Sequence, residues 1–225
     1  QKQLNFFSTF GFIKFPGLFD REINKITDAF EQVWSTNGSG HYGKPHDHKS
    51  RSALVLFIDQ NQYLCSILDD PRIDGIIGSV LGEDYNYSGS DGNYYVGDTP
   101  WHSDGYLKHH NYTSVKMAFY LDTVTRDSGC LRVIPGSHKL HDKYADTVQD
   151  IFVNTRENMT EEQLGIHGDE VPAIALETRP GDLLMFNHRI KHSSWGGSSK
   201  RRMFTMNFQQ RFREEDIDDL REDIG

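Results

Sequence analysis

The sequence has few cysteines, no basic block and no long apolar run. Its two cysteines, Cys65 and Cys130, are too few and too far apart for a disulfide framework, which favours a reducing, cytoplasmic location. The formal net charge of −9 argues against nucleic-acid binding, because phosphate contacts need a basic face. Neither a run of about 18 apolar residues nor a signal-peptide pattern is present, so we expect no membrane span and no membrane partner.

The aromatic content and the rhythm of short apolar segments favour a β-rich fold. Aromatic residues make up 12% of the 225 residues, which suits sheets better than a helical bundle. From residue 85 onwards, short apolar runs alternate with Gly, Pro, Asp and Asn, as in an all-β sandwich or jelly roll. We expect one domain over 1–225, helical over about 1–84 and a jelly-roll core over about 85–210. The expected strands are 85–97, 114–122, 129–134, 173–178, 182–187 and 202–209.

The N-terminal part predicts helices that pack against this core. Residues 3–15 predict a short helix that passes through a glycine turn into a first strand. Apolar residues at helical spacing predict an amphipathic helix over about 20–35, with Asp20 as its N-cap. A second helical block is expected over about 60–82, ended by Gly82.

Three polar segments lie outside these elements. Residues 36–52 are rich in glycine and predict a loop. Residues 140–172 interrupt the β pattern with partly helical sequence, which predicts a surface excursion or a lid. The acidic stretch 211–225 predicts a solvated terminal helix.

The most informative motif joins an imidazole to a carboxylate. His102 and Asp104 are two residues apart, and on a β-strand such residues point to the same side. His192, far along the chain, would complete a 2-His-1-carboxylate set, which leaves metal positions open and is typical of non-haem Fe(II) oxygenases. Arg201 and Arg202 follow, and a guanidinium that pairs with a carboxylate suggests a metal-bound oxoacid such as 2-oxoglutarate.

The motif is weak alone, because the chain has eleven histidines. Trp101 before it and Gly105 after it support a strand end beside a turn, where scaffolds commonly present catalytic side chains. Other histidines are given simpler interpretations. His46-Asp47-His48 is interpreted as a surface cluster, and His138 as a structural histidine in a turn.

Four longer motifs carry a resemblance to a known family. They are Trp-His-Ser-Asp-Gly at 101–105, the run at 121–139 that ends in Pro-Gly-Ser-His-Lys, Arg-Pro-Gly-Asp-Leu-Leu-Met-Phe at 179–186, and His-Ser-Ser followed by Arg-Arg within 192–202. In these motifs, and in its opening Gly-Phe-Ile segment, the chain resembles the phytanoyl-CoA dioxygenase family nearly from end to end. The resemblance implies a double-stranded β-helix that binds Fe(II), 2-oxoglutarate and O2.

The resemblance also assigns the metal ligands position by position. It implies that His102 and Asp104 are the first two ligands and His192 the third. His188 precedes His192 with the same strand parity and is the competing candidate. His192 is preferred because Ser194 occupies the family's position for a hydroxyl that touches the cosubstrate.

The cosubstrate arginine is either Arg201 or Arg202. Alternation along the last strand puts Arg201 on the same face as Thr205 and Asn207, which favours Arg201. Arg202 stays open as the alternative, because the spacing from the last ligand is short for the family. At the family's aromatic position beside the cosubstrate this chain has Ala118, which is a departure from the pattern.

The expected activity is hydroxylation of a small-molecule substrate, with release of succinate and CO2. A cupin-like isomerase or lyase that uses no oxoacid, and a non-catalytic metal-binding β-sandwich, stay open as alternatives. The candidate substrate contacts are Tyr106, His109 and Arg132, with Lys108 and His110 as further candidates.

Overall fold

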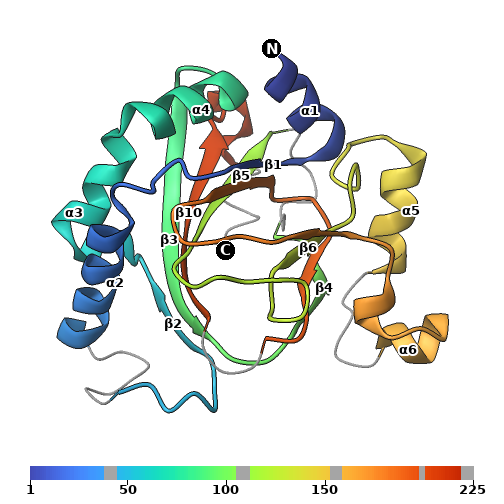
Figure 1. Cartoon of the computed structure of the whole chain (residues 1–225). Coiled ribbons are helices and arrows are strands. Elements are labelled where there is room, and N and C mark those ends of the chain that lie inside the picture. The colour runs from blue at the N-terminus through green and yellow to red at the C-terminus, as the bar shows by residue number, and fades with distance from the viewer. Residues whose placement is uncertain (38–44, 105–111, 153–158, 198–200, 219–225) are drawn as a thin grey trace.

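The computed structural model describes residues 1–225 apart from 38–44, 105–111, 153–158, 198–200 and 219–225. Two antiparallel sheets face each other at its centre (Figure 1). The larger sheet has the strand order β1-β8-β5-β10-β3-β2, and the smaller has the order β4-β9-β6-β7. The strands are β1 Phe12–Phe15, β2 Ser52–Val55, β3 Tyr85–Tyr95, β4 Thr99–His102, β5 Ser114–Tyr120, β6 Leu131–Val133, β7 Ile174–Leu176, β8 Leu183–Asn187, β9 His192–Ser194 and β10 Arg201–Gln210.

Helices lie on the outer sides of both sheets. In the described part of the chain, none of them is long and apolar enough to cross a membrane. The expected mainly-β, double-stranded β-helix with N-terminal packing helices is confirmed. The α-helices are α1 Lys2–Phe10, α2 Ile23–Asn37, α3 Gln62–Cys65, α4 Pro71–Leu81, α5 Lys143–Ile151 and α6 Met159–Leu164, and the 3-10 helices are η1 Ile58–Gln60, η2 Ser66–Asp69, η3 Gly168–Glu170 and η4 Glu214–Asp216.

Helices α2, α3 and α4 cover the outer face of the larger sheet (Figure 1). The apolar residues of α2 recur at helical spacing, and Ile26, Phe30 and Val33 are almost fully buried. They belong to one core cluster with the outward-facing residues of the sheet, among them Phe119 and Phe204. The largest core cluster therefore lies behind the larger sheet. A second apolar cluster fills part of the space between the sheets, and the polar cavity lies beside it.

Strand β10 shows how the two faces are separated. Alternate residues of a strand point to opposite faces, and Phe204, Met206 and Phe208 pack into the helix-covered core. Arg201 and Thr205 point the other way and line a cavity between the sheets. The same alternation holds along β5, where outward residues are apolar and inward residues include charged and aromatic side chains.

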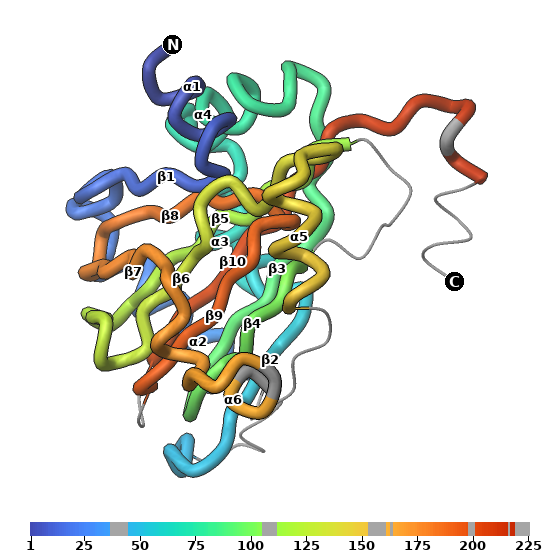
Figure 2. The backbone as a smooth tube through the Cα atoms, turned by 90° about the vertical axis from the view of Figure 1, so that its right-hand side faces the viewer, coloured from blue at the N-terminus to red at the C-terminus, as the bar shows by residue number. Residues whose placement is uncertain are grey.

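The excursion at 140–172 packs against the outer face of the smaller sheet. Figure 2 shows α5 and α6 on that side of the molecule. Val148 and Phe152 of the α5 region form a buried cluster with Trp101 and Trp195 from the smaller sheet. In its described part this segment is therefore a surface excursion that packs as a layer on the smaller sheet.

The N-terminal predictions are confirmed in outline and corrected in detail. Helix α1 ends at Gly11, whose φ of 82° is the left-handed turn that leads into β1. Helix α2 begins at Ile23, so Asp20 does not cap it and instead pairs with Arg179 at 2.9 Å. The helical block over 60–82 is broken into short pieces, because Pro71 starts a new helix at its first turn.

Several strands were not predicted because they are short. Strand β2 has four residues, which is too few for a periodic signal, and the three residues of β9 were expected on a strand only because they include His192. The terminal stretch contains η4, and 219–225 lie outside the described residues.

The position of the core behind the larger sheet gives a first prediction. Phe204 is fully buried and stacks on Phe119 with 4.7 Å between ring centroids, so Phe204→Ala should cost about 3–5 kcal/mol of unfolding free energy. Phe6, which is 41% exposed, provides the matched control, and Phe6→Ala should cost clearly less. Chemical denaturation of both variants tests this, and equal losses would contradict this position of the core.

Candidate metal centre

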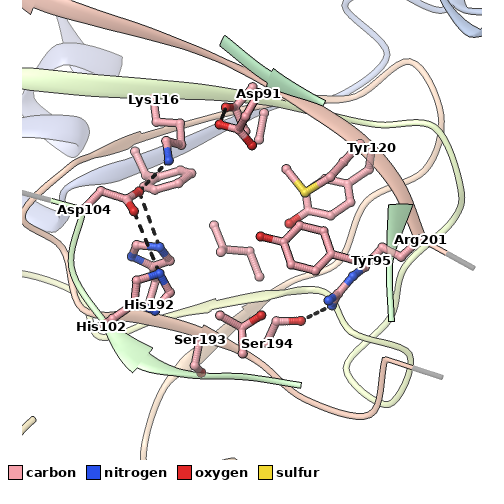
Figure 3. A pocket seen from close by; sticks show the side chains of 16 residues that line it. Asp91, Tyr95, His102, Asp104, Lys116, Tyr120, His192, Ser193, Ser194 and Arg201 are labelled. Carbon is pink, nitrogen blue, oxygen red and sulfur yellow. Dashed lines mark hydrogen bonds and ion pairs between the residues drawn. The ribbon is translucent and has the colours of Figure 1, made fainter. Parts of the chain in front are cut away.

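Three candidate ligands meet at one end of the cavity between the sheets. His102 ends β4 and His192 begins β9, and the antiparallel pairing of these strands sets the two residues directly opposite each other. Asp104 follows β4 and turns its carboxylate toward both rings (Figure 3). Its oxygens lie 3.8 Å from Nε2 of His102 and 3.6 Å from Nε2 of His192. One ligand atom of each residue lies within 4.8 Å of the other two, a spacing that one metal ion can bridge.

Each imidazole is oriented by its own strand. Nδ1 of His102 lies 2.8 Å from the carbonyl oxygen of Pro100, and Nδ1 of His192 lies 3.0 Å from that of Ile190. A carbonyl oxygen can only accept, so each Nδ1 is the donor and each Nε2 keeps its lone pair for a ligand. Burial, with His102 nearby, lowers the pKa of His192 to about 3, so this ring is neutral near pH 7, as metal binding requires.

Asp104 is held at its backbone and at its carboxylate. Its backbone N–H donates to the carbonyl oxygen of His188 at 2.8 Å, and the ammonium of Lys116 lies 2.8 Å from Oδ2. Burial opposes ionisation of Asp104, but the Lys116 ammonium beside it outweighs burial and holds the pKa of Asp104 well below its ordinary value. Sequence reasoning missed Lys116, although a charged residue inside the apolar run 114–122 was a usable signal.

These donors fit a divalent metal ion such as Fe(II). Two imidazole nitrogens and one carboxylate oxygen leave several coordination positions free, as in non-haem iron sites. In the described part of the chain they form the one group of three or more His, Cys, Asp or Glu side chains close enough to share an ion. A structural zinc site would instead be closed by four protein ligands.

Arg201 lies at the other end of the cavity, beside Ser194 (Figure 3). Its buried guanidinium donates to the carbonyl oxygens of Gly129 and Gly97 and to the Ser194 hydroxyl. Gly129 is required here, because its φ is 90° and a Cβ at this position would collide with the guanidinium.

One donor of this guanidinium has no partner. The buried Nε of Arg201 makes no hydrogen bond to any described residue. A buried guanidinium in a cavity wall that is paired with no described carboxylate favours an anionic ligand, because a carboxylate supplies the opposite charge. A metal site at one end of the cavity and a carboxylate site at the other fit a ligand that is an oxoacid with a second, distal carboxylate.

Aromatic side chains line the space between the two ends. The hydroxyl groups of Tyr95 and Tyr120 point into the cavity (Figure 3). The guanidinium carbons of Arg51 and Arg201 lie 4.1 and 4.6 Å from the centre of the Tyr95 ring. Ala118, which stands at the family's aromatic position, lies in the same wall. Tyr95 and Tyr120 supply aromatic surface there instead. Sequence reasoning did not single out either tyrosine.

The structure separates the competing candidates. Arg202 points away from the cavity and forms ion pairs of 2.7 Å with Asp122 and Glu31, so its charge is already neutralised. His188 is not part of the ligand group, although its backbone contacts Asp104.

The expected substrate contacts are not brought to the cavity. Arg132 is buried on the opposite face of β6 and donates to the carbonyl oxygens of Asp169, at 2.5 Å, and Arg126, at 2.9 Å. It therefore ties the smaller sheet to its outer layer. Tyr106 and His109, together with Lys108 and His110, lie outside the described residues.

Gln149 of α5 joins three segments around the metal centre. Its Oε1 accepts from the hydroxyl of Ser103, the residue between two candidate ligands, at 2.9 Å. Its Nε2 donates to the carbonyl oxygens of Ser137 at 2.7 Å and Arg189 at 2.6 Å. Arg189 lies three residues before His192, and Ser103 lies between His102 and Asp104. A single amide therefore connects the segments that carry all three ligands. Sequence reasoning missed Gln149 because its partners are distant in the chain.

Comparison with known families gives one match. The family model described as phytanoyl-CoA dioxygenase matches residues 7–204, which is most of the chain. A search of curated protein sequences finds no significant match.

Similar solved structures share the fold. The non-haem alpha ketoglutarate dependent carbocyclase SnoK from nogalamycin biosynthesis has a TM-score of 0.69 at 20% identity and aligns with 93% of this chain and 83% of its own. EctD from S. alaskensis, also solved with 2-oxoglutarate and 5-hydroxyectoine, has a TM-score of 0.68 in its apo form at 19% identity, over 93% and 76% of the two chains. EvdO2 from Micromonospora carbonacea var. aurantiaca, complexed with 2-oxoglutarate, has a TM-score of 0.65 at 19% identity, over 94% and 91%.

The bridging amide gives a second prediction. Gln149→Leu removes three hydrogen bonds and leaves two inward-facing carbonyl groups without their donor, so it should lower the unfolding free energy by about 1–3 kcal/mol. Because the ligand segments lose their connection, the affinity for Co(II) or Fe(II) should also fall by about tenfold.

Gln60 offers the control for this variant. Its amide also donates to two carbonyl groups, those of Val55 and Leu56, but it is exposed and does not line the cavity. Gln60→Leu should keep the metal affinity of the parent chain. Competition with a chromogenic chelator measures both, and unchanged metal binding in Gln149→Leu would refute a positioning role for the amide.

Proposed function

The chain belongs to the phytanoyl-CoA dioxygenase family, and we propose that it hydroxylates an unactivated carbon of a small molecule, using Fe(II), 2-oxoglutarate and O2. The family and the cofactor class make it a non-haem iron oxygenase. The products beside the hydroxylated substrate would be succinate and CO2. Other outcomes of the same oxidation, such as desaturation or ring closure, differ only in which bond of the substrate changes.

One observation carries this proposal. The same cavity holds the His102, Asp104 and His192 side chains at one end and, at the other, a buried arginine that is paired with no carboxylate of the described residues. An isomerase or lyase that needed only the metal would have no use for the second feature. A structural metal site would have no use for either the cavity or the free coordination positions.

The roles of the residues follow from their positions. We assign His102, Asp104 and His192 to the metal, and Arg201 with Ser194 to the distal carboxylate of 2-oxoglutarate. Bound Fe(II) supplies the activation of O2 that is coupled to oxidative decarboxylation of the oxoacid. The protein fixes the two ends of the oxoacid and thereby its orientation at the metal.

The walls of the cavity control what else enters. Burial holds the pKa of Tyr95 above its ordinary value, and the same is true of Tyr120, so both hydroxyls stay protonated and act as donors toward an oxoacid. Leu131, Phe186 and Met203 provide apolar surface that limits water near the reacting groups.

Two coarser expectations belong with this proposal. We propose that 1–225 forms one dioxygenase domain, because the two sheets share a single cavity and the family match spans both. We propose a cytoplasmic location, which is supported by two free cysteines, one of them exposed.

An anaerobic titration tests the function. Adding 2-oxoglutarate to the Fe(II)-loaded protein should produce the visible charge-transfer band of a chelated oxoacid. His192→Ala should abolish the band, because the metal loses a ligand. Arg201→Gln should keep the band but raise the 2-oxoglutarate concentration needed for it by about 10- to 100-fold, since a charge-assisted pair is lost.

The neighbouring arginine is the matched control. Arg202→Gln removes the same charge from the other face of β10 and should leave the titration unchanged. Pyruvate, which lacks the distal carboxylate, should chelate weakly in the parent chain and equally weakly in Arg201→Gln. The proposal fails if Fe(II) binds and no oxoacid produces a band.

A further inference from the structure

Lys116 is a charged residue in the wall of the cavity, at the centre of the larger sheet. It lies on β5 and is flanked in register by Phe186 of β8 and Asn207 of β10. Its side chain is only 16% exposed, and its ammonium lies 2.8 Å from Oδ2 of Asp104. Figure 3 shows the ammonium between Asp104 and Asp91, above the space that separates the candidate ligands from Arg201.

Asp104 is the close ionic partner of Lys116 among the described residues. The second carboxylate nearby, Asp91, is engaged by other donors. One of its oxygens accepts from the Thr205 hydroxyl, and the other accepts from the Asn93 amide at 2.5 Å. The ammonium therefore acts on the carboxylate that we assign to the metal.

This contact limits how Asp104 can bind a metal. A carboxylate can offer a metal one oxygen or both, and here Oδ2 is already beside an ammonium. A metal that took both oxygens would have to displace Lys116 into a wall that includes the Phe186 ring. Held in this way, Asp104 offers one oxygen and keeps the remaining coordination positions free for another ligand.

The charge of Lys116 acts in opposite directions on a metal and on an oxoacid. Ligands to a metal must be deprotonated, so two metal-binding imidazoles and the Asp104 carboxylate would carry a total charge of −1, and Lys116 cancels it. The ammonium therefore repels an incoming divalent cation and attracts an incoming dianion such as 2-oxoglutarate. Both effects are strong where water is largely excluded.

We propose that Lys116 is a positioning residue that keeps Asp104 a one-oxygen ligand and favours the oxoacid at the expense of metal affinity. The inference rests on the proposed function, because it assumes that a metal and an oxoacid share this cavity. It differs from a purely structural role in one respect. A lysine that only stabilised the wall would, when removed, weaken the binding of both ligands.

The test measures the two affinities separately in Lys116→Met and Lys116→Arg. Fe(II) affinity is measured anaerobically by chelator competition, and 2-oxoglutarate affinity by the charge-transfer band. In Lys116→Met, Fe(II) should bind more tightly than in the parent chain, while 2-oxoglutarate should bind about tenfold more weakly. Lys116→Arg, which keeps the charge, should restore oxoacid binding to within about threefold of the parent.

Lys14 provides the control. It lies on β1 of the same sheet and is also paired with an aspartate, at 3.6 Å from Asp182, but it does not line the cavity. Lys14→Met should change neither affinity. If Lys116→Met does not fold, as judged by its thermal melt, the same measurements on Lys116→Gln decide the question.

The outcomes are distinguishable. A loss of both affinities in Lys116→Met, or of neither, overturns the role of Lys116 while the proposed function stands. Absence of the band in the parent chain overturns the proposed function. In that case weaker or unchanged Fe(II) binding by Lys116→Met would also overturn the effect of Lys116 on the metal, and tighter binding would support it.

Discussion

The antiparallel register of β4 against β9 is the constraint on which the candidate site depends. It sets His102 opposite His192, with 4.1 Å between the ring centroids, and lets the chain after β4 return Asp104 to the same point. A shift of one residue would turn one imidazole to the opposite face of the sheet, because side chains alternate along a strand. The apolar residues that alternate with the ligands, such as Trp101 in its buried cluster, make such a shift costly.

The second constraint is the burial of charge between two sheets. The cavity wall contains Asp91, Asp104, Lys116 and Arg201, and ionised groups are tolerated at such positions only when partners compensate for lost water. Asp91, Asp104 and Lys116 find these partners within the wall. Arg201 differs from them, because no carboxylate of the described residues pairs with its guanidinium, and an anionic ligand would supply that charge.

The helices packed on the outer faces of the two sheets hold the strands that line the cavity in place. On one side the helices bury the outward face of the larger sheet, and β10 can therefore present Arg201 inward from a rigid position. On the other side α5 packs on the smaller sheet and sends Gln149 toward Ser103 and Arg189. A segment that resembles a surface excursion in sequence thus contributes hydrogen bonds to the metal centre.

The sequence by itself determined the β-rich fold class, the amphipathic helix that became α2, and the three residues that the structure brings together as candidate ligands. The fold class and the helix could be predicted because their signals are local: strand periodicity and helical spacing. The motif of His102 and Asp104 is also local, whereas His192 was preferred over His188 through the resemblance to the family. Alternation along one strand also favoured Arg201 over Arg202, and the structure places the first in the cavity and the second in outward ion pairs.

Only the tertiary structure decided which groups act together. Lys116, Gln149 and Tyr95 gain their roles from partners in distant segments, and Arg132 loses its expected role because β6 turns it outward. The short strands β2 and β9 exist because neighbouring strands complete their hydrogen bonds, which no periodic signal in three or four residues reveals. Contacts between distant segments depend on register and packing, and these are properties of the folded chain as a whole.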